Sequence, residues 1–163
     1  RRSELVFLEC HAWGVELTGA RSAVVLRSPA DDLVHGLKYG GWAELAGFMG
    51  RRMARCVIPP PLSSGPYLVV PVPTTRRRMR SRGYNQAYLL ASVVSEEVGR
   101  HLQEALEMRH GGPTQVGLHL AQRWANVKKS FAVRDDTMVV LSGVRVLLVD
   151  DVLTTGSTAA AEA

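Results

Sequence analysis

A chain of 163 residues, of which 46% are hydrophobic and 21% charged, has the size and composition of one globular domain. No apolar run approaches the roughly 18 residues that a membrane span needs, and the start lacks an apolar stretch with a small-residue cleavage site. We therefore expect a soluble, cytoplasmic protein without membrane insertion. The two cysteines lie far apart without a CxxC partner and support neither a disulfide framework nor a complete zinc site. A formal charge of +5 suits an anionic partner.

Two helices are predicted between residues 29 and 55, whereas residues 1–28 are harder to place. Within residues 1–28, the apolar stretch Ala23 to Leu26 is a candidate edge strand. Pro29 and the acids of DDLVHGLKY are typical of a helix start, because the backbone amides of a first turn favour acidic side chains. Apolar residues at helical spacing predict a second helix from Trp42 to about Arg55, and IPPPLSSGP at 58–66 predicts a loop.

Strands alternate with helices from residue 67 onward. YLVVPV (67–72) and RVLLVD (145–150) are typical of buried parallel strands, and ALEM (105–108) and FAV (131–133) are shorter candidates. An apolar stripe predicts a helix over 84–102. Together these elements predict an α/β fold with a doubly wound, mostly parallel sheet, which binds its ligand at the carboxyl ends of the strands. The polar stretch 110–130 is long enough to be a mobile active-site loop.

Two acids followed by a hydroxyl-rich turn form the motif with the clearest chemistry. Asp150 and Asp151 end the best strand, where burial without a partner is costly, so they require hydroxyls, a metal ion or both. TTGST (154–158) then supplies hydroxyls, a glycine free to take positive φ and successive amides, which suit a phosphate. Acids for a polyol beside a phosphate nest predict a sugar phosphate ligand. No lysine follows at the spacing of a P-loop nucleotide site.

The segment VLLVDDVLTTGST (146–158) resembles the phosphoribosyl-pyrophosphate motif of type I phosphoribosyltransferases. Together with LVHGLKYGGWAELA (33–46), VPVPTTRRRMRSRGYNQAYLLA (70–91) and TQVGLHLAQRWANVKKSF (114–131), it resembles the ComF family, which is linked with DNA uptake in competent bacteria. The resemblance implies a fold of the type I phosphoribosyltransferase kind over residues 29–163, with the N-terminal helices forming part of a hood.

The same resemblance leads us to expect that the chain is a piece of a longer protein. Family members commonly carry an N-terminal zinc module with CxxC pairs, whereas this chain has only Cys10 in that region, so residues 1–28 are read as the remnant of such a module. The helix begun by GSTAAAEA has no following strand to cover. We therefore expect the C-terminal part of the sheet to be missing.

The resemblance also implies roles for particular residues. The two acids would bind the ribose hydroxyls and Mg²⁺, directly or through water, and would act with Arg77 and Arg109 as the candidate catalytic residues. The ribose 5′-phosphate would contact Thr154, Thr155, Gly156, Ser157 and Thr158. Pyrophosphate would be held by a loop made of Pro73, Thr74, Thr75, Arg76 and Arg77. A flexible loop containing Gln115, Arg123 and Asn126 would close over the reacting centre.

Several of these assignments have a structural alternative that stays open. The arginine cluster RRRMRSR (76–82) also suits a solvated face or a nucleic-acid contact, although arginine forks match phosphate oxygens well. Asn85, within the family's RGxNQA signature, also suits the start of the following helix. Arg123 and Asn126 are also placed to tie their loop down.

The function that the resemblance implies is binding of phosphoribosyl pyrophosphate with Mg²⁺, followed by transfer or sensing of the phosphoribosyl group in competence or DNA uptake. If it is an enzyme, it is a glycosyltransferase of the phosphoribosyltransferase kind, in which Mg²⁺ and arginines stabilise the leaving group. The alternative is a non-catalytic adaptor that contacts single-stranded DNA or helicase components of the DNA-uptake machinery. An oligomer is compatible with both, and the acceptor base is not indicated.

Overall fold

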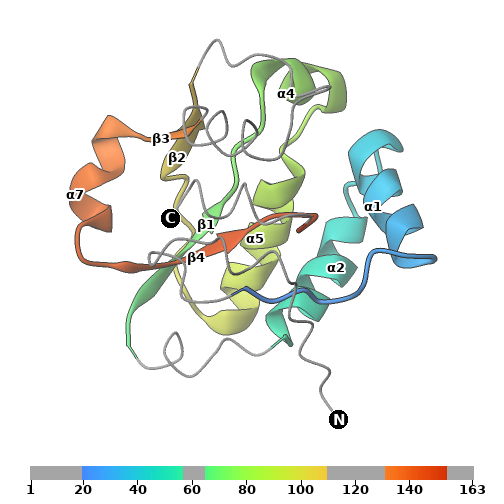
Figure 1. Cartoon of the computed structure of the whole chain (residues 1–163), viewed down its shortest axis with the longest axis horizontal. Helices are drawn as coiled ribbons and strands as arrows, with labels where there is room; N and C mark the ends of the chain where they lie inside the picture. The colour runs from blue at the N-terminus through green and yellow to red at the C-terminus, as the bar shows by residue number, and fades with distance from the viewer. Residues whose placement is uncertain (1–19, 57–64, 110–130, 154–163) are drawn as a thin grey trace, which may run out of the picture.

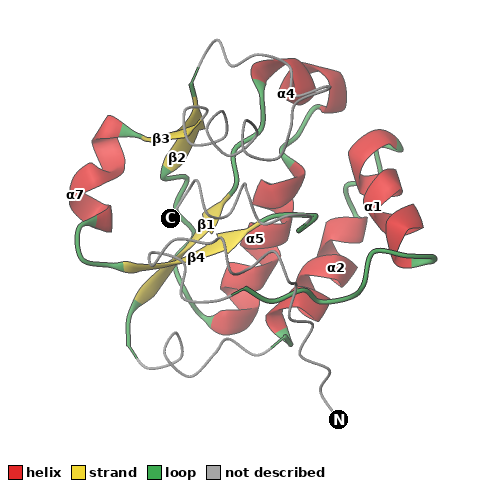
Figure 2. Ribbon diagram, in the orientation of Figure 1, coloured by secondary structure: helices red, strands yellow, loops and turns green. Residues whose placement is uncertain are grey.

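The computed structural model describes residues 20–56, 65–109 and 131–153, which form a mixed α/β arrangement (Figures 1 and 2). The elements in chain order are α1 (Ala30–Tyr39), α2 (Leu45–Ala54), β1 (Tyr67–Pro71), α4 (Arg76–Arg82), α5 (Gln86–Val98), β2 (Leu106–Met108), β3 (Phe131–Val133), a 3-10 turn (Asp135–Thr137), α7 (Met138–Leu141) and β4 (Arg145–Val149). Among the described residues, no helix has the length and apolar character that crossing a bilayer requires.

Strand β1 lies between two parallel neighbours. On one side β4 pairs with it in parallel, from Tyr67 opposite Arg145 to Pro71 opposite Val149. On the other side the chain after α5 forms a parallel bridge between Val69 and Leu102. The carboxyl ends of β1 and β4 therefore meet at one edge of the sheet, as the sequence predicts for a parallel α/β fold.

The pair formed by β2 and β3 departs from the predicted parallel pattern. These strands are antiparallel, with Leu106 opposite Val133 and Met108 opposite Phe131. The two short segments were thus correctly predicted as strands, and their antiparallel pairing is an exception within a sheet that was predicted to be mostly parallel.

Two predictions, of a strand and of a helix end, were wrong. The stretch Ala23 to Leu26 is not a strand but a series of bends, in which the Arg27 amide donates to the Val25 carbonyl at 2.9 Å. The helix predicted to reach residue 102 ends at Val98, because Gly99 takes the left-handed conformation (φ 62°) and its amide closes the last turn.

The hydrophobic core lies between the β1–β4 pair and the helices α1, α2 and α5. Leu37, Val69 and Leu90 have no exposed surface at all. Helices α2 and α5 approach closely at Gly50, where a Cβ atom would stand only 2.6 Å from the Val93 Cβ. The buried cluster consists of Leu37, Ala46, Tyr67, Val69, Leu90, Ala91, Val94 and Val149.

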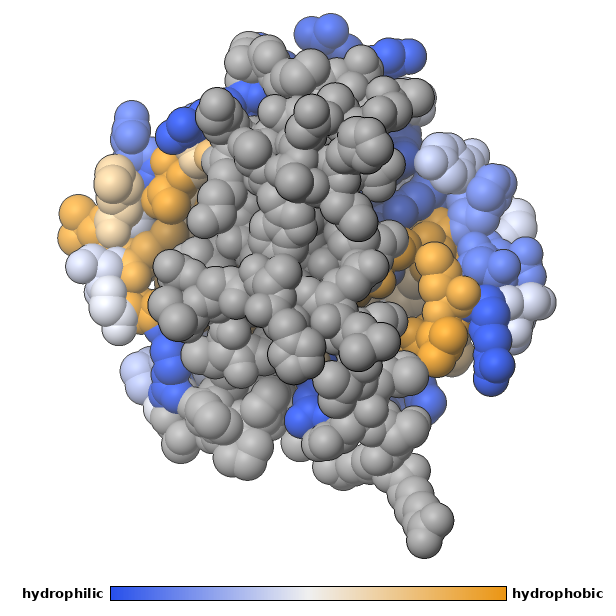
Figure 3. Space-filling model, viewed as in Figure 1, coloured by the Kyte–Doolittle hydropathy of each residue, from blue (hydrophilic) through white to orange (hydrophobic). Residues whose placement is uncertain are grey.

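Helix α7 lies away from this core, on the far side of the strands from α1 (Figure 1). None of its residues is buried, and Met138 and Val139 are 59% and 88% exposed. Figure 3 shows this flank as one of the places where hydrophobic residues reach the surface of the described part.

Candidate functional site

The paired acids stand at the carboxyl edge of the β1–β4 pair. Asp150 and Asp151 directly follow β4, whose last residue, Val149, accepts a hydrogen bond from the amide of Val72 just beyond β1 at 3.0 Å. The end of β1 and the end of β4 are thus joined, and the segment after β1 begins beside the two acids. Figure 1 shows the tip of β4 pointing toward α1.

The side chain of Asp151 is buried and forms an ion pair with a lysine from α1. Its Oδ1 lies 3.0 Å from Lys38 Nζ, and its side chain keeps only 5% of its surface exposed, against 22% for the lysine. Its second oxygen, Oδ2, is buried and accepts no hydrogen bond from the part of the chain that the structure describes. A buried carboxylate oxygen with spare acceptor capacity is suited to a hydroxyl or a cation that enters the site.

Asp150 has a raised pKa of about 6, against an ordinary value of 3.8. Burial is the main cause, and the negative charge of Asp151 adds to it. The Asp151 amide, which donates to Asp150 Oδ1 at 2.8 Å, and the charge of Lys38 partly oppose this rise. Among the described residues, Lys38 and the Asp151 amide only partly offset the burial and mutual repulsion of the two acids, so a cation or hydroxyl donors would stabilise them further.

The segment after β1 forms the predicted loop only up to Thr75. The Thr75 hydroxyl accepts a hydrogen bond from the Arg78 amide at 3.2 Å and caps α4, so Arg76 and Arg77 are the first two residues of a helix. Pro73 and Thr74 remain in the loop, and the Thr74 hydroxyl oxygen is buried without a partner among the described residues. The predicted loop thus ends two residues earlier than expected.

Helix α4 exposes most of its arginines. Arg76, Arg77, Arg78 and Arg80 are exposed, and none of the helix residues is buried. Arg82 differs, because its guanidinium lies 5.0 Å from the centre of the Tyr39 ring. This contact joins the end of α4 to the last residue of α1.

Asn85 has a structural role. It is buried, its side-chain oxygen accepts from the Ala87 amide at 3.1 Å, and its Nδ2 donates to the Val72 carbonyl at 3.0 Å. The residue therefore begins α5, as one of the two alternatives predicted, and also ties that helix to the end of β1. Gln86 is likewise buried, with its Oε1 left without a partner among the described residues.

The last turn of α1 belongs to a segment that carries the family resemblance (33–46), but the sequence assigned it no role at this site. Leu37 accepts a hydrogen bond from the Tyr84 hydroxyl at 2.7 Å, Lys38 pairs with Asp151, and Tyr39 contacts Arg82. Three successive residues thus contact the start of α5, the end of β4 and the end of α4. Only the tertiary fold brings these segments together, so no spacing in the sequence could have revealed it.

Other predicted site residues fall elsewhere. Arg109 follows β2 and is exposed. The predicted phosphate nest and the predicted closing loop lie outside the described residues. They are Thr154, Thr155, Gly156, Ser157 and Thr158 of the nest, and Gln115, Arg123 and Asn126 of the loop.

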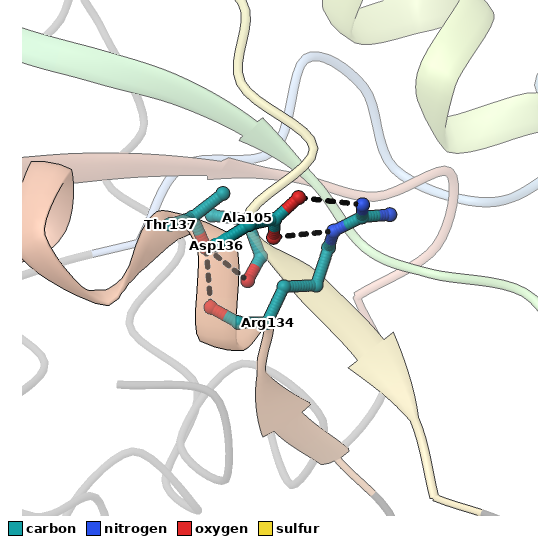
Figure 4. Close-up of polar contacts among 4 residues, drawn as sticks. All are labelled: Ala105, Arg134, Asp136 and Thr137. Carbon is teal, nitrogen blue, oxygen red and sulfur yellow. Dashed lines mark hydrogen bonds and ion pairs between the residues drawn. The ribbon is translucent and has the colours of Figure 1, made fainter.

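A second polar cluster lies at the turn after β3 (Figure 4). Arg134 forms two hydrogen bonds to Asp136, at 3.1 and 2.9 Å, which raise the arginine pKa and lower that of the carboxyl. The Thr137 hydroxyl donates to the Ala105 carbonyl at 3.2 Å, linking this turn to the start of β2. The ion pair borders a cavity of about 310 Å³, lined also by Tyr88, Leu102, Gln103 and Glu104. Because both ion-pair partners are exposed, we assign this pair no catalytic role.

Comparisons with known proteins identify relatives. The chain is 33% identical to the DNA utilization protein YhgH of Escherichia coli K12 over 138 residues, which cover 81% of this chain and 58% of that protein. The protein of the same name in Salmonella typhi is 32% identical over 136 residues, with the same coverage. Competence protein F of Haemophilus influenzae is 38% identical over 96 residues, which are 57% of this chain and 41% of that protein.

The chain spans less than two thirds of the length of these curated relatives. No family model matches it, and no solved structure matches it either.

Proposed function

This chain belongs to the ComF family of DNA utilization and competence proteins, and on that premise we propose that it binds phosphoribosyl pyrophosphate with Mg²⁺ and serves in the use or uptake of DNA. The ligand would lie at the joined ends of β1 and β4. Its ribose hydroxyls would meet Asp150 and Asp151, and its pyrophosphate the segment that starts at Pro73.

The state of the two acids carries the proposal. One buried carboxylate keeps an oxygen without a partner in the described part of the chain, and its neighbour has a raised pKa because burial and a second negative charge disfavour its ionised form. Ribose hydroxyls would donate hydrogen bonds to these oxygens, and a divalent cation would neutralise them. A simple turn-capping role would leave neither feature explained.

The residues present fit Mg²⁺ best as part of a ligand complex. The described residues contain no group of three or more His, Cys, Asp or Glu side chains able to hold a metal ion. Mg²⁺ commonly uses one or two carboxylates and takes its remaining ligands from water and substrate phosphates. Asp150 and Asp151 supply those carboxylates, and the bound cation would offset the negative charge of the pyrophosphate.

Phosphoribosyl transfer extends this proposal from binding to catalysis. Departure of pyrophosphate needs positive charge around its oxygens more than it needs a base, and Arg76 and Arg77 at the first turn of α4 are exposed and free to turn toward it. Release of pyrophosphate in the presence of an acceptor base tests this step. Binding without release would make the protein a sensor of the ligand.

A second candidate function, contact with single-stranded DNA, is favoured by α4 itself. In the described chain, no carboxylate forms an ion pair with Arg76, Arg77, Arg78 or Arg80, so this helix presents uncompensated positive charge. Binding to a phosphate backbone would weaken steeply with salt, and replacing arginines would reduce that salt dependence.

Calorimetric titration separates the two candidates. We expect the wild-type protein to bind phosphoribosyl pyrophosphate in the presence of Mg²⁺, and the variant carrying Asp150→Asn and Asp151→Asn to lose this binding. Retained binding in the double variant would refute the assigned site. DNA binding that survives the double variant, with no ligand binding by the wild type, would favour the adaptor instead.

A further inference from the structure

Lys38 pairs with one oxygen of Asp151, the carboxylate that a cation entering the site would also be expected to contact. Its Nζ lies 3.0 Å from Asp151 Oδ1, and Asp151 is almost fully enclosed. The sequence gives this lysine no role, since it stands in α1, more than one hundred residues before the acids. It pairs directly with Asp151, and its charge also acts on Asp150 without an ion pair between the two side chains.

The backbone that carries Lys38 is held on both sides. The preceding residue, Leu37, is fully buried and its carbonyl accepts the Tyr84 hydroxyl at 2.7 Å. The following residue, Tyr39, contacts the Arg82 guanidinium. A lysine side chain has several rotatable bonds, so its ammonium can leave Asp151 while the helix turn stays in place.

A divalent cation and the Lys38 ammonium compete for the same carboxylate. Both are positive, and each would repel the other at the separations that one carboxylate allows. A cation that enters alone must displace the ammonium without offering it another anion. A cation that arrives with a diphosphate brings an anion to which the ammonium can turn.

We propose that Lys38 is a resident counter-ion of Asp151 that makes the site accept a divalent cation together with a diphosphate in preference to the free cation. This inference rests on the proposed function, because it assumes that the two acids form the ligand site. In the free protein, Lys38 thus holds the Asp151 carboxylate in an ion pair. When the ligand binds, its ammonium moves from Asp151 to a phosphate oxygen.

Titration with Mn²⁺ alone tests the first half of the proposal. The unbound ion is measured by its electron paramagnetic resonance signal. We expect Lys38→Met to bind Mn²⁺ about tenfold more tightly than the wild type, because the competing charge is gone. Lys38→Arg keeps the ion pair and should stay close to the wild type. Arg134→Met, which removes the exposed ion pair at the turn after β3 (Figure 4), is the matched control and should change nothing.

The second half is tested by calorimetry with phosphoribosyl pyrophosphate and Mg²⁺. Lys38→Met should bind this ligand more weakly than the wild type although it binds the free ion more tightly, a reversal that general loosening of the fold would not produce. Thermal unfolding shows whether each variant is folded. If the Met variant is not, Lys38→Gln keeps a donor for Asp151 without the charge, and the same results are expected of it.

The outcomes are distinguishable. Mn²⁺ affinity that is unchanged or weaker in both neutral variants overturns the role of Lys38, and so does the lack of Mn²⁺ binding by every variant. Failure of the wild type to bind phosphoribosyl pyrophosphate overturns the proposed function, while the Mn²⁺ titration still decides whether Lys38 competes with a cation.

Discussion

Replacing Asp150 by asparagine should stabilise the protein in the absence of ligand. The pKa of Asp150 is raised from 3.8 to about 6, chiefly by burial and then by the charge of Asp151. At neutral pH the folded protein therefore holds a carboxylate that is easier to ionise in the unfolded chain. Asparagine removes that charge, and its side-chain oxygen can still accept the Asp151 amide hydrogen bond.

The size of the effect follows from the difference between the two pKa values. At about 1.4 kcal/mol for each pH unit, it corresponds to about 3 kcal/mol in the free energy of unfolding, an upper bound because the half-buried carboxylate keeps part of its hydration. For a chain of this length, that upper bound is on the order of 6–12 °C in Tm.

The pH dependence has a definite sign. Below pH 3.8, Asp150 is protonated in both the folded and the unfolded chain, so it does not lower the free energy of unfolding. Between 3.8 and about 6 the folded protein retains a proton that the unfolded chain has lost, so wild-type stability should fall as the pH rises through this window. Above this pH window, the free energy of unfolding is lowered by the full amount.

Thermal unfolding from pH 4 to 8, without divalent cations or ligand, measures both effects. We expect Asp150→Asn to be more stable than the wild type at pH 7 and to lose the decline between pH 4 and 6. Equal stability at pH 7, together with an unchanged pH profile, would refute the reasoning that this acid is held in its charged form at a cost.

Three further substitutions test the packing that holds the site. Gly50→Ala should destabilise the protein by about 1–3 kcal/mol in urea unfolding, because its Cβ would overlap Val93, whereas Gly47→Ala in the same helix meets nothing closer than 3.7 Å and should be neutral or stabilising. Asn85→Ala should cost about 1–3 kcal/mol in the same measurement, since it removes a helix cap and leaves a carbonyl without its donor. Leu90→Ala, at a fully buried position, should cost about 2–5 kcal/mol, and a cost below 1 kcal/mol would show that the core is not packed as described.

The sequence predicted the site wherever local patterns determine the structure. An apolar run that ends in two acids predicts a strand with carboxylates at its carboxyl end, and β4 with Asp150 and Asp151 has this form, although only Val149 of the strand is fully buried. The same local logic gave α1, α2 and β1. Asn85 was predicted as a candidate helix start for the same reason, because the hydrogen bond that its side-chain oxygen accepts from a nearby backbone amide is a short-range interaction.

Prediction failed where the decisive contact is distant or the apolar pattern is missing. Helix α4 has no buried face, so periodicity could not reveal it, although its cap residues Thr75 and Gly83 stand in the sequence. Leu102 continues the apolar stripe of α5 but pairs with Val69 instead, because Gly99 ends the helix. The pairing of Lys38 with Asp151 depends on the whole fold and has no signal in either segment.

The central claim is that the acids after β4 form the binding site for phosphoribosyl pyrophosphate. Its most direct test is the calorimetric affinity for this ligand with Mg²⁺, measured for the wild type, Asp151→Asn and the control Asp136→Asn at the exposed turn. We predict saturable binding by the wild type and the control, and at least a tenfold loss in Asp151→Asn, since an enclosed carboxylate that meets hydroxyls or a cation contributes more than about 1.4 kcal/mol. Equal affinity in all three proteins, or no binding by the wild type, would contradict the account.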